Sequence, residues 1–364
     1  MKKTLISMAV AMASISYVQA GTVTTEGPDL ILSTDGGFKV KTSDKKASFQ
    51  VGGRIQYDYN YSEKNGKNDE SDFDVRRARL FVKGHLGEWA YKSQFNLGEN
   101  GDSSSGTVED LYIQYKGWGD AAKLTVGRAK EPFGLEQLTS SKDISVLERS
   151  ALTERFTPGR NEGLQLSGKN GQFNYAAGIY EGGSVGDGKG DDEARQLAFT
   201  GRVVFAPVTE KGNVVHFGLA YTDRGNNSEL ESALGFEAAA VMGAFHVQTE
   251  YFNGDTLSEG GIDGYYLQAG WIVTGESRPY KDGKFKRVKP MAASGAWEVV
   301  ARYETGDGDF GDVELSETDA SAYTVGLNWY ATNNARLGVN YTVGDSEVNS
   351  DDGNELRARI QYVF

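Results

Sequence analysis

The stretch from Gly127 to Gly163 contains six basic residues interleaved with six acidic ones. They are Arg128, Lys130, Lys142, Arg149, Arg155 and Arg160, and Glu131, Glu136, Asp143, Glu148, Glu154 and Glu162. Lys acts on an oxyanion as a point charge, whereas Arg can bind one through two parallel hydrogen bonds. A ring of such cations around a narrow path lowers the electrostatic barrier for anions. If the rest of the chain encloses a lumen, this segment is the candidate to fold inward and narrow it.

Patterns that support catalysis are missing from the sequence. The three histidines, His85, His216 and His246, fall in the middle of alternating segments and have no nucleophile motif beside them. The sequence has no Gly-rich phosphate-binding loop, no HExxH motif and no cysteine. We therefore expect no catalytic residue, no metal site and no cofactor.

The first twenty residues predict a secretory signal peptide. Lys2 and Lys3 precede a short apolar run, and Val18 and Ala20 occupy the positions that specify cleavage before Gly21. A membrane anchor is the alternative, but the run is short and interrupted by serine. The net charge of −13 argues against a nucleic-acid partner. Without cysteines, an exported protein needs another source of stability, such as a closed hydrogen-bonded sheet.

From residue 48 onward the chain alternates apolar and polar residues in runs of about ten, which is the period of a strand with one wet and one apolar face. Phe49, Val51, Ile55 and Tyr57, for example, alternate with Gln50, Arg54, Gln56 and Asp58. Sixteen such runs cover 48–61, 72–86, 88–98, 107–117, 121–130, 163–169, 172–181, 194–206, 213–223, 233–243, 244–254, 263–276, 294–305, 320–331, 335–344 and 355–364. An even number is typical of single-chain outer-membrane barrels.

Short connections between the runs alternate with long polar ones, as periplasmic turns alternate with outer loops in such barrels. The long ones are 62–71, 99–106, 131–162, 182–193, 224–232, 255–262, 306–319 and 345–354. The basic segment 277–293 is an exception, because parity places it on the periplasmic side although it is long. It either breaks the strand count or is a periplasmic excursion.

The chain ends on the aromatic Phe364 of an alternating strand, which is typical of outer-membrane barrels. Together these features predict an all-β fold, a sixteen-stranded antiparallel transmembrane β-barrel over residues 48–364, in the outer membrane of a Gram-negative bacterium. Segment 131–160 is the expected inward-folded constriction loop. Segment 21–47 is interpreted as a short hairpin or a periplasmic extension.

The alternation also predicts where charges point. Ala78, Leu80 and Val82 set the lipid face of one strand, so Arg77 and Arg79 point into the lumen, where an arginine is hydrated. Arg76 falls on the outward parity, and either reaches the membrane interface or is redirected by a β-bulge.

Several motifs resemble the phosphate-selective porins O and P, in matching order along essentially the whole mature chain. They are GTVTTEGPDL at 21–30, GGRIQYDY at 52–59, RRARLFV at 76–82, FGLEQLTSSKDISVLER at 133–149, VVFAP at 203–207, GNVVHFGLAY at 212–221, GAWEVVARYE at 295–304, LNWYA at 327–331 and the terminal QYVF. The resemblance implies a homotrimeric sixteen-stranded channel for phosphate or polyphosphate, with its third loop at the constriction.

The same resemblance implies site residues. Lys142 matches the family's constriction lysine, and the family's pore-lining basic residues match Arg54, Arg76 and Arg77. An acidic residue near the constriction matches Glu109 or Asp110. The family's arginine-rich outer loop has no counterpart, since segment 224–240 contributes Arg224 alone.

Other interpretations stay open on the sequence. Lys142 could be solvated, or neutralised by Asp143 or Glu148, and the lumen arginines 54, 77 and 79 could pair with acids that stiffen the wall. The chain could be a general or cation-preferring porin. Alternatively, a surface partner, or divalent cations that bridge to lipopolysaccharide, could bind to eight aspartates of the long loops, namely Asp187, Asp191, Asp192, Asp307, Asp309, Asp312, Asp351 and Asp352. Inorganic anions and outer-membrane lipid are the remaining expected partners.

Overall fold

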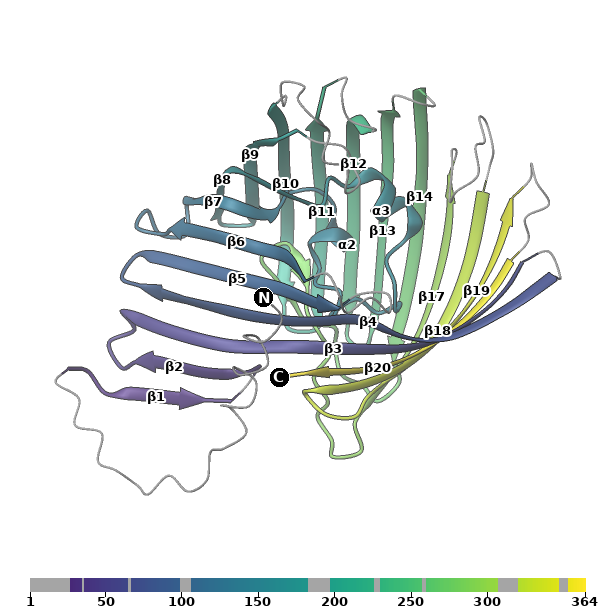
Figure 1. Cartoon of the computed structure of the whole chain (residues 1–364), viewed down its shortest axis with the longest axis horizontal. Helices are drawn as coiled ribbons and strands as arrows, with labels where there is room; N and C mark the ends of the chain where they lie inside the picture. Colours follow the sequence, from purple (N-terminus) through teal and green to yellow (C-terminus); the bar gives the residue numbers. More distant parts are fainter. Residues whose placement is uncertain are drawn as a thin grey trace, which may run out of the picture.

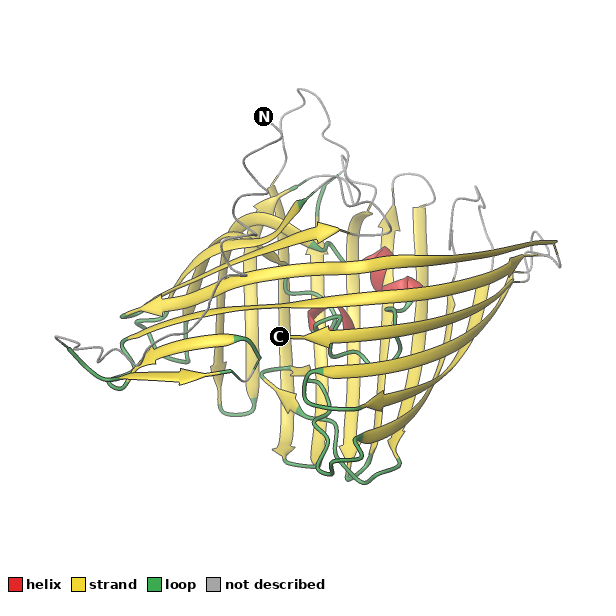
Figure 2. Ribbon diagram, turned by 60° about the horizontal axis from the view of Figure 1, so that its bottom comes forward, coloured by secondary structure: helices red, strands yellow, loops and turns green. Residues whose placement is uncertain are grey.

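A computed structural model describes residues 27–34, 36–64, 67–98, 106–182, 197–225, 230–256, 260–306, 320–346 and 353–364. Sixteen of its strands form one closed antiparallel barrel (Figures 1 and 2), which confirms the predicted fold class. The first eight are β3 (Ala47–Lys64), β4 (Lys67–Leu86), β5 (Trp89–Gly98), β6 (Thr107–Tyr115), β7 (Lys123–Lys130), β8 (Arg160–Asn170), β9 (Phe173–Glu181) and β10 (Leu197–Glu210). The second eight are β11 (Asn213–Asp223), β12 (Leu230–Met242), β13 (Phe245–Thr256), β14 (Gly260–Ile272), β17 (Ala296–Gly306), β18 (Ala320–Tyr330), β19 (Ala335–Ser346) and β20 (Gly353–Val363).

The barrel closes where the last strand pairs with the first. β20 runs antiparallel to β3, with Ile360 opposite Tyr57. The terminal residue Phe364 extends this pairing, because its amide donates to the Gly53 carbonyl at 3.1 Å and its carbonyl accepts from the Gly53 amide at 2.7 Å. Closure leaves no strand of the barrel with a free edge along this seam.

A hairpin at the N-terminal end of the described chain covers the rest of the β3 edge. It consists of β1 (Leu30–Ser33) and β2 (Phe38–Thr42). Residues 38–41 of β2 pair with residues 48–51 of β3, just before the part of β3 that pairs with β20. The hairpin therefore continues the sheet beyond the end of β20.

The two faces of the wall differ as the alternation predicts. On β3, Ile55 and Tyr57 face outward with 47% and 44% of their surface exposed, whereas Gln56 and Asp58 are fully buried inside the barrel. Aromatic pairs lie on the outer face near the short turns, among them Trp89–Tyr115, Phe245–Trp271 and Trp297–Trp329. Such rings suit the interface between hydrocarbon and water.

The expectation of a loop over residues 62–71 is wrong. β3 and β4 continue through most of it, with Tyr61 opposite Ser71 and Ser62 opposite Glu70. The polar composition suggested a loop, but the main-chain ladder between two strands needs no apolar side chains once the hairpin extends beyond the apolar band. Polarity in this stretch therefore does not mark the end of the strands.

The basic segment 277–293 leaves the strand count intact. It lies between β14 and β17, at the end that carries the short turns, and forms a hairpin of β15 (Tyr280–Lys281) and β16 (Lys284–Phe285) around Asp282 and Gly283, both with positive φ. This inward hairpin, residues 277–293, packs into the lumen. Phe285 is fully buried, and the Tyr280 hydroxyl lies 2.6 Å from Nδ1 of His216 on β11.

Residues 131–159, between β7 and β8, also fold into the lumen and are called the inward segment below. They contain α2 (Leu135–Leu138) and α3 (Ala151–Phe156). Phe156 stacks on Phe252 of β13 with ring centroids 5.5 Å apart, and the Leu135 amide donates to Glu250 at 2.6 Å. On another part of the wall, the Ser145 hydroxyl donates to Glu298 of β17 at 2.7 Å. The segment is thus fixed to the wall at several points.

Among the described residues, none of the helices is both long enough and apolar enough to cross a membrane.

Candidate functional site

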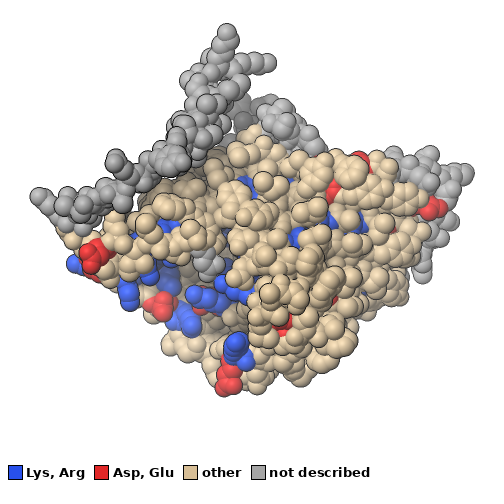
Figure 3. Space-filling model, turned by 90° about the horizontal axis from the view of Figure 1, so that it is seen from below, with Lys and Arg blue, Asp and Glu red and all other residues tan. Residues whose placement is uncertain are grey.

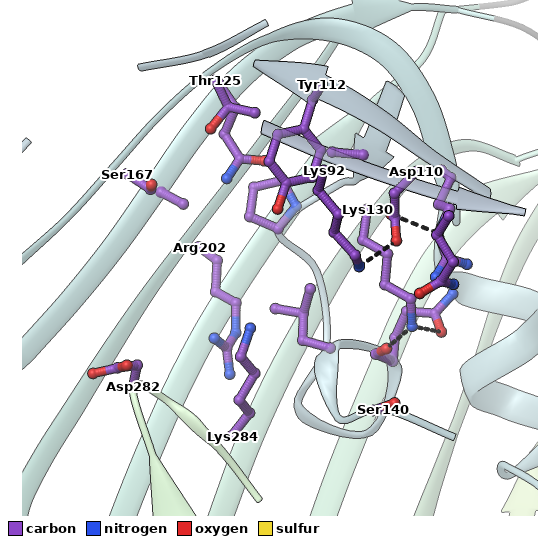
Figure 4. A pocket seen from close by; sticks show the side chains of 18 of the residues that line it. Lys92, Asp110, Tyr112, Thr125, Lys130, Ser140, Ser167, Arg202, Asp282 and Lys284 are labelled. Carbon is purple, nitrogen blue, oxygen red and sulfur yellow. Dashed lines mark hydrogen bonds and ion pairs between the residues drawn. The ribbon is translucent and has the colours of Figure 1, made fainter. Parts of the chain in front are cut away.

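A cavity of about 930 Å³ lies between the barrel wall, the inward segment and the inward hairpin (Figure 4). Fourteen basic residues line this central cavity, namely Arg54, Arg76, Arg77, Arg79, Lys92, Lys123, Lys130, Arg149, Arg160, Lys169, Arg202, Lys281, Lys284 and Lys286. Its acidic lining residues are Asp110, Asp120, Glu154 and Asp282. Viewed from below in Figure 3, Lys and Arg side chains gather on one part of the surface. The cavity is positive although the chain as a whole is negative.

A β-bulge explains how two consecutive arginines both face the lumen. Gln56 pairs with Arg77 while the next residue, Tyr57, pairs with Val75, so Arg76 is the extra residue of β4. Its guanidinium donates inward to Glu148 at 3.1 Å. Of the two alternatives that the sequence leaves for Arg76, redirection by a bulge is the one that occurs.

A second bulge directs two consecutive acids inward. On β5, Gln94 pairs with Asp110 and Phe95 pairs with Val108, so Glu109 is the extra residue of β6. Glu109 and Asp110 are both buried. Two inward acids at adjacent positions break the alternation that a regular strand requires.

Glu109 and Asp110 hold three basic residues in one network. Glu109 pairs with Arg79 at 2.5 Å and with Arg160 at 2.6 Å. Asp110 pairs with Arg160 at 3.0 Å and with Lys92 at 2.6 Å, the latter contact being drawn in Figure 4. Two carboxylates thus offset most of the charge of three cations. These five residues are called the wall network below, and Arg79 belongs to it.

Arg54 differs from these arginines because it makes no ion pair among the described residues. Its Nη1 donates to the Ser140 hydroxyl of the inward segment at 3.0 Å. Its Nε is buried and has no hydrogen-bond partner within the described chain, and the same holds for the hydroxyl of Ser141. All three residues line the central cavity. Arg54 and the two serines therefore offer uncommitted hydrogen-bonding groups and an uncompensated charge on one side of the path.

Lys142 follows these serines but is placed differently. Its Nζ lies 3.4 Å from Asp143, and the residue is not among those that line the central cavity. Burial lowers the pKa of Lys142, an effect that Asp143 opposes and Arg287 and Arg54 reinforce. Lys142 therefore carries a charge that is partly compensated within the inward segment itself.

Arg202 and Lys284 lie side by side at the opposite side of the cavity in Figure 4. Arg202 pairs with the buried Glu237 at 2.5 Å and also donates to the Gly283 carbonyl of the inward hairpin at 3.0 Å. Burial, assisted by Lys286 and Arg202, lowers the pKa of Lys284 to about 8. The inward hairpin thus adds cations to a lumen that the strands alone do not supply.

Comparison with known proteins connects this positive lumen to a family. The chain matches the family described as phosphate-selective porin O and P over residues 49–232 and 222–364. It is also 31% identical to Porin O of Pseudomonas aeruginosa, in an alignment that covers 99% of this chain and 98% of the relative. This chain belongs to the phosphate-selective porin O and P family. It is an outer-membrane porin of a Gram-negative bacterium, a channel rather than an enzyme.

Solved porin structures share the fold at low identity. An anion-selective porin from Comamonas acidovorans aligns with a TM-score of 0.63 and 15% identity, over 87% of this chain and 100% of that one. The trimer form of OmpT from Vibrio cholerae aligns with a TM-score of 0.55 and 13% identity, over 87% of this chain and 99% of that one. These likenesses show the barrel architecture alone.

Several lumen cations of this porin were missed as site residues by sequence reasoning. Lys92 sits on the inward parity of its strand, so alternation alone could have added it to the candidates. Lys284 and Lys286 have no such signal, because a Gly turn at 282–283 predicts a hairpin but not its direction. Arg224, the residue left in place of the family's arginine-rich loop, is buried and pairs with Glu131 at 2.9 Å. The loop aspartates at positions 187, 191, 192, 307, 309, 312, 351 and 352 lie outside the described residues.

Proposed function

We propose that this porin passes anions in preference to cations, and that inorganic phosphate and polyphosphate are its substrates. The observation that carries the proposal is the lining of the central cavity, fourteen basic residues against four acidic ones. Adding Glu109, Glu148 and Glu237, which pair with lining arginines, still leaves an excess of seven positive charges (14 − 7). Selectivity follows the charges at the narrow path rather than the net charge of the chain.

Arg54, Ser140 and Ser141 are the proposed point of contact for the anion. A guanidinium and two hydroxyls can donate to three oxygens of a tetrahedral oxyanion, and the charge of Arg54 is not spent on a carboxylate among the described residues. Arg79, the cross-strand neighbour of Arg54 on β4, forms the adjacent part of the wall together with Glu109 and Asp110. Lys142 contributes at longer range, because Asp143 compensates part of its charge.

The proposed assembly is a homotrimer surrounded by outer-membrane lipid and lipopolysaccharide. The trimer form of OmpT from Vibrio cholerae, which shares the barrel fold, supports this assembly. We further propose that residues 1–20 are removed on export and that residues 21–47 lie on the periplasmic side, where the β1–β2 hairpin adjoins the short-turn end of β3. Heat-resistant trimers on gel electrophoresis, and a mature chain beginning at Gly21, are the expected observations.

Block of chloride current by phosphate tests the substrate assignment. The purified porin is inserted in a planar bilayer in KCl, and potassium phosphate is added at constant ionic strength. We expect the chloride conductance to fall in a concentration-dependent manner, because phosphate occupies the Arg54 site for longer than chloride. A conductance that is unchanged by phosphate would reject phosphate as a substrate and leave a general porin.

A further inference from the structure

The carboxylate of Glu148 lies inside a cluster of four arginines. Arg76 donates to its two oxygens at 3.1 and 3.2 Å, and Arg77 donates to the same two oxygens at 3.0 Å each. Arg359 donates to Oε1 at 2.5 Å, and Nη1 of Arg357 lies 3.4 Å from it. Two forked guanidiniums on one planar carboxylate is the arrangement by which arginine binds a free oxyanion.

The cations and the carboxylate come from different parts of the fold. The arginines belong to the wall strands β4 and β20, whereas Glu148 belongs to the inward segment. Arg76 and Arg77 also line the central cavity, and Arg77 keeps 4% of its side chain exposed while Glu148 is in place. Glu148 keeps 23% of its side chain exposed. The cluster is therefore an oxyanion site on the lumen wall whose occupant is attached to another segment.

The four arginines do not depend equally on Glu148. Arg359 also binds Asp58 through two contacts of 2.6 and 2.5 Å, and Arg357 also binds Glu355 at 2.8 Å. For Arg77, Glu148 is the one carboxylate with which it pairs among the described residues. Removing the Glu148 charge would thus free the fork of Arg77 in particular.

The backbone around Glu148 has hydrogen bonds of its own, in addition to those of the side chain. Arg302 donates to the Glu148 carbonyl at 3.0 Å, and Arg359 donates to the Leu147 carbonyl at 2.6 Å. Burial alone would raise the pKa of the Glu148 carboxyl, but Arg77, Arg359 and Arg76 outweigh it and hold this pKa well below its usual range. The side chain is thus a permanent anion at neutral pH, and the segment has other anchors.

We propose that Glu148 is a specificity-determining residue of this porin: its carboxylate is a tethered competitor that occupies the Arg76–Arg77 oxyanion site and weakens the retention of permeating phosphate there. Because this competitor is attached to the protein, it is present at the site at every phosphate concentration. Conduction requires an anion to bind well enough to enter and weakly enough to leave. Glu148 makes the binding of the anion weak enough for it to leave.

This inference rests on the proposed function, and one experiment separates the two. The half-blocking phosphate concentration for chloride current is measured in planar bilayers for the unmodified porin, Glu148→Gln and Glu154→Gln. Glu154 is the matched control, because it lies on the same inward segment and itself lines the cavity, but it pairs with Arg149 instead of Arg77. Both changes remove one negative charge, whereas Glu148→Gln alone frees the Arg77 fork.

We expect Glu148→Gln to lower the half-blocking phosphate concentration at least about tenfold, with a lower saturating phosphate current, and Glu154→Gln to change it about twofold or less. If Glu148 only braces the segment, its loss widens the path and raises the half-blocking concentration, which would overturn the inference. An unchanged value, or equal shifts in both variants, would overturn it as well.

The remaining outcomes divide the two proposals. Block in the unmodified porin with no gain in Glu148→Gln keeps the proposed function and rejects the role of Glu148. If phosphate blocks Glu148→Gln but does not block the unmodified porin, phosphate is rejected as a substrate of the unmodified porin. The same result supports the role of Glu148 as a competitor. Glu148→Asp serves if the glutamine variant does not assemble. It keeps the charge but shortens the reach, and we expect a smaller decrease in the half-blocking concentration, with no decrease counting against the inference.

Discussion

Arg54 on the wall strand β3 donates a 3.0 Å hydrogen bond to the hydroxyl of Ser140 on the inward segment. This contact brings an arginine without an ion pair among the described residues next to a serine whose neighbour, Ser141, has an unpartnered buried hydroxyl. The inward segment therefore does more than narrow the barrel. It places neutral donors beside an uncompensated charge, which is the combination that an oxyanion can use.

Arg54→Gln should weaken phosphate block more than any other single charge removal from the cavity lining. The half-blocking phosphate concentration is expected to rise about tenfold, since one charge-assisted contact is lost. Lys123→Gln is the matched control, because Lys123 lines the same cavity and is already paired with Asp120 at 2.9 Å. Similar effects of the two substitutions would show that only the summed charge matters.

Lys142→Glu should shift the selectivity of the channel toward cations while heat-resistant trimers persist. The shift should be smaller than that of Arg54→Glu, because Asp143 compensates Lys142 and Lys142 does not line the central cavity. The zero-current potential of both variants measures the difference. Unchanged selectivity in Lys142→Glu would remove this lysine from the ion path.

Anion preference should decrease as pH rises from 7 to 9. The pKa of Lys284 is lowered to about 8, so Lys284 is charged below that pH and neutral above it, with about a tenth still charged one pH unit higher. Its charged neighbours are Lys286, Arg202, Lys92 and Asp282. The anion-to-cation permeability ratio is measured across this range. In Lys284→Arg the decrease should become smaller, because arginine stays protonated, and an identical pH profile in that variant would assign the titration elsewhere.

Arg224→Met should destabilise the barrel and loosen the start of the inward segment. Arg224 and Glu131 form an ion pair at 2.9 Å in which both side chains are almost fully buried. Removing one partner leaves a buried carboxylate without its counter-charge, at an expected cost of about 3–5 kcal/mol in the free energy of unfolding. Denaturant titration of the refolded protein in detergent measures it. A loss of equal size in Arg224→Lys would indicate that geometry, and not charge, stabilises the pair.

The strands and the direction of most side chains could be predicted from the sequence, because a wall between lipid and water imposes strict alternation. Ile55 and Gln56 obey this rule on opposite faces. Arg76 and Glu109 do not, since a bulge inserts one residue and reverses the facing of everything up to the next irregularity. Bulges depend on pairing between strands, which a single sequence does not display.

The candidate site could be located only in part. The sequence predicts that the segment around Lys142 folds inward and shows which charged residues it contains. It does not show which residues these charges pair with. Whether Lys142 pairs with Asp143, or Glu148 with Arg77, depends on distances set by the whole barrel. The inward hairpin around Lys284 carried even less signal, because its basic residues are equally compatible with a surface excursion.

The zero-current potential of the unmodified porin under a KCl gradient tests the central claim most directly. The excess of basic residues around the central cavity predicts a potential whose sign reports a higher permeability for chloride than for potassium. A potential of the opposite sign, from channels that retain the size and heat resistance of intact trimers, would contradict the assignment of an anion channel and leave a cation-preferring porin on the same barrel.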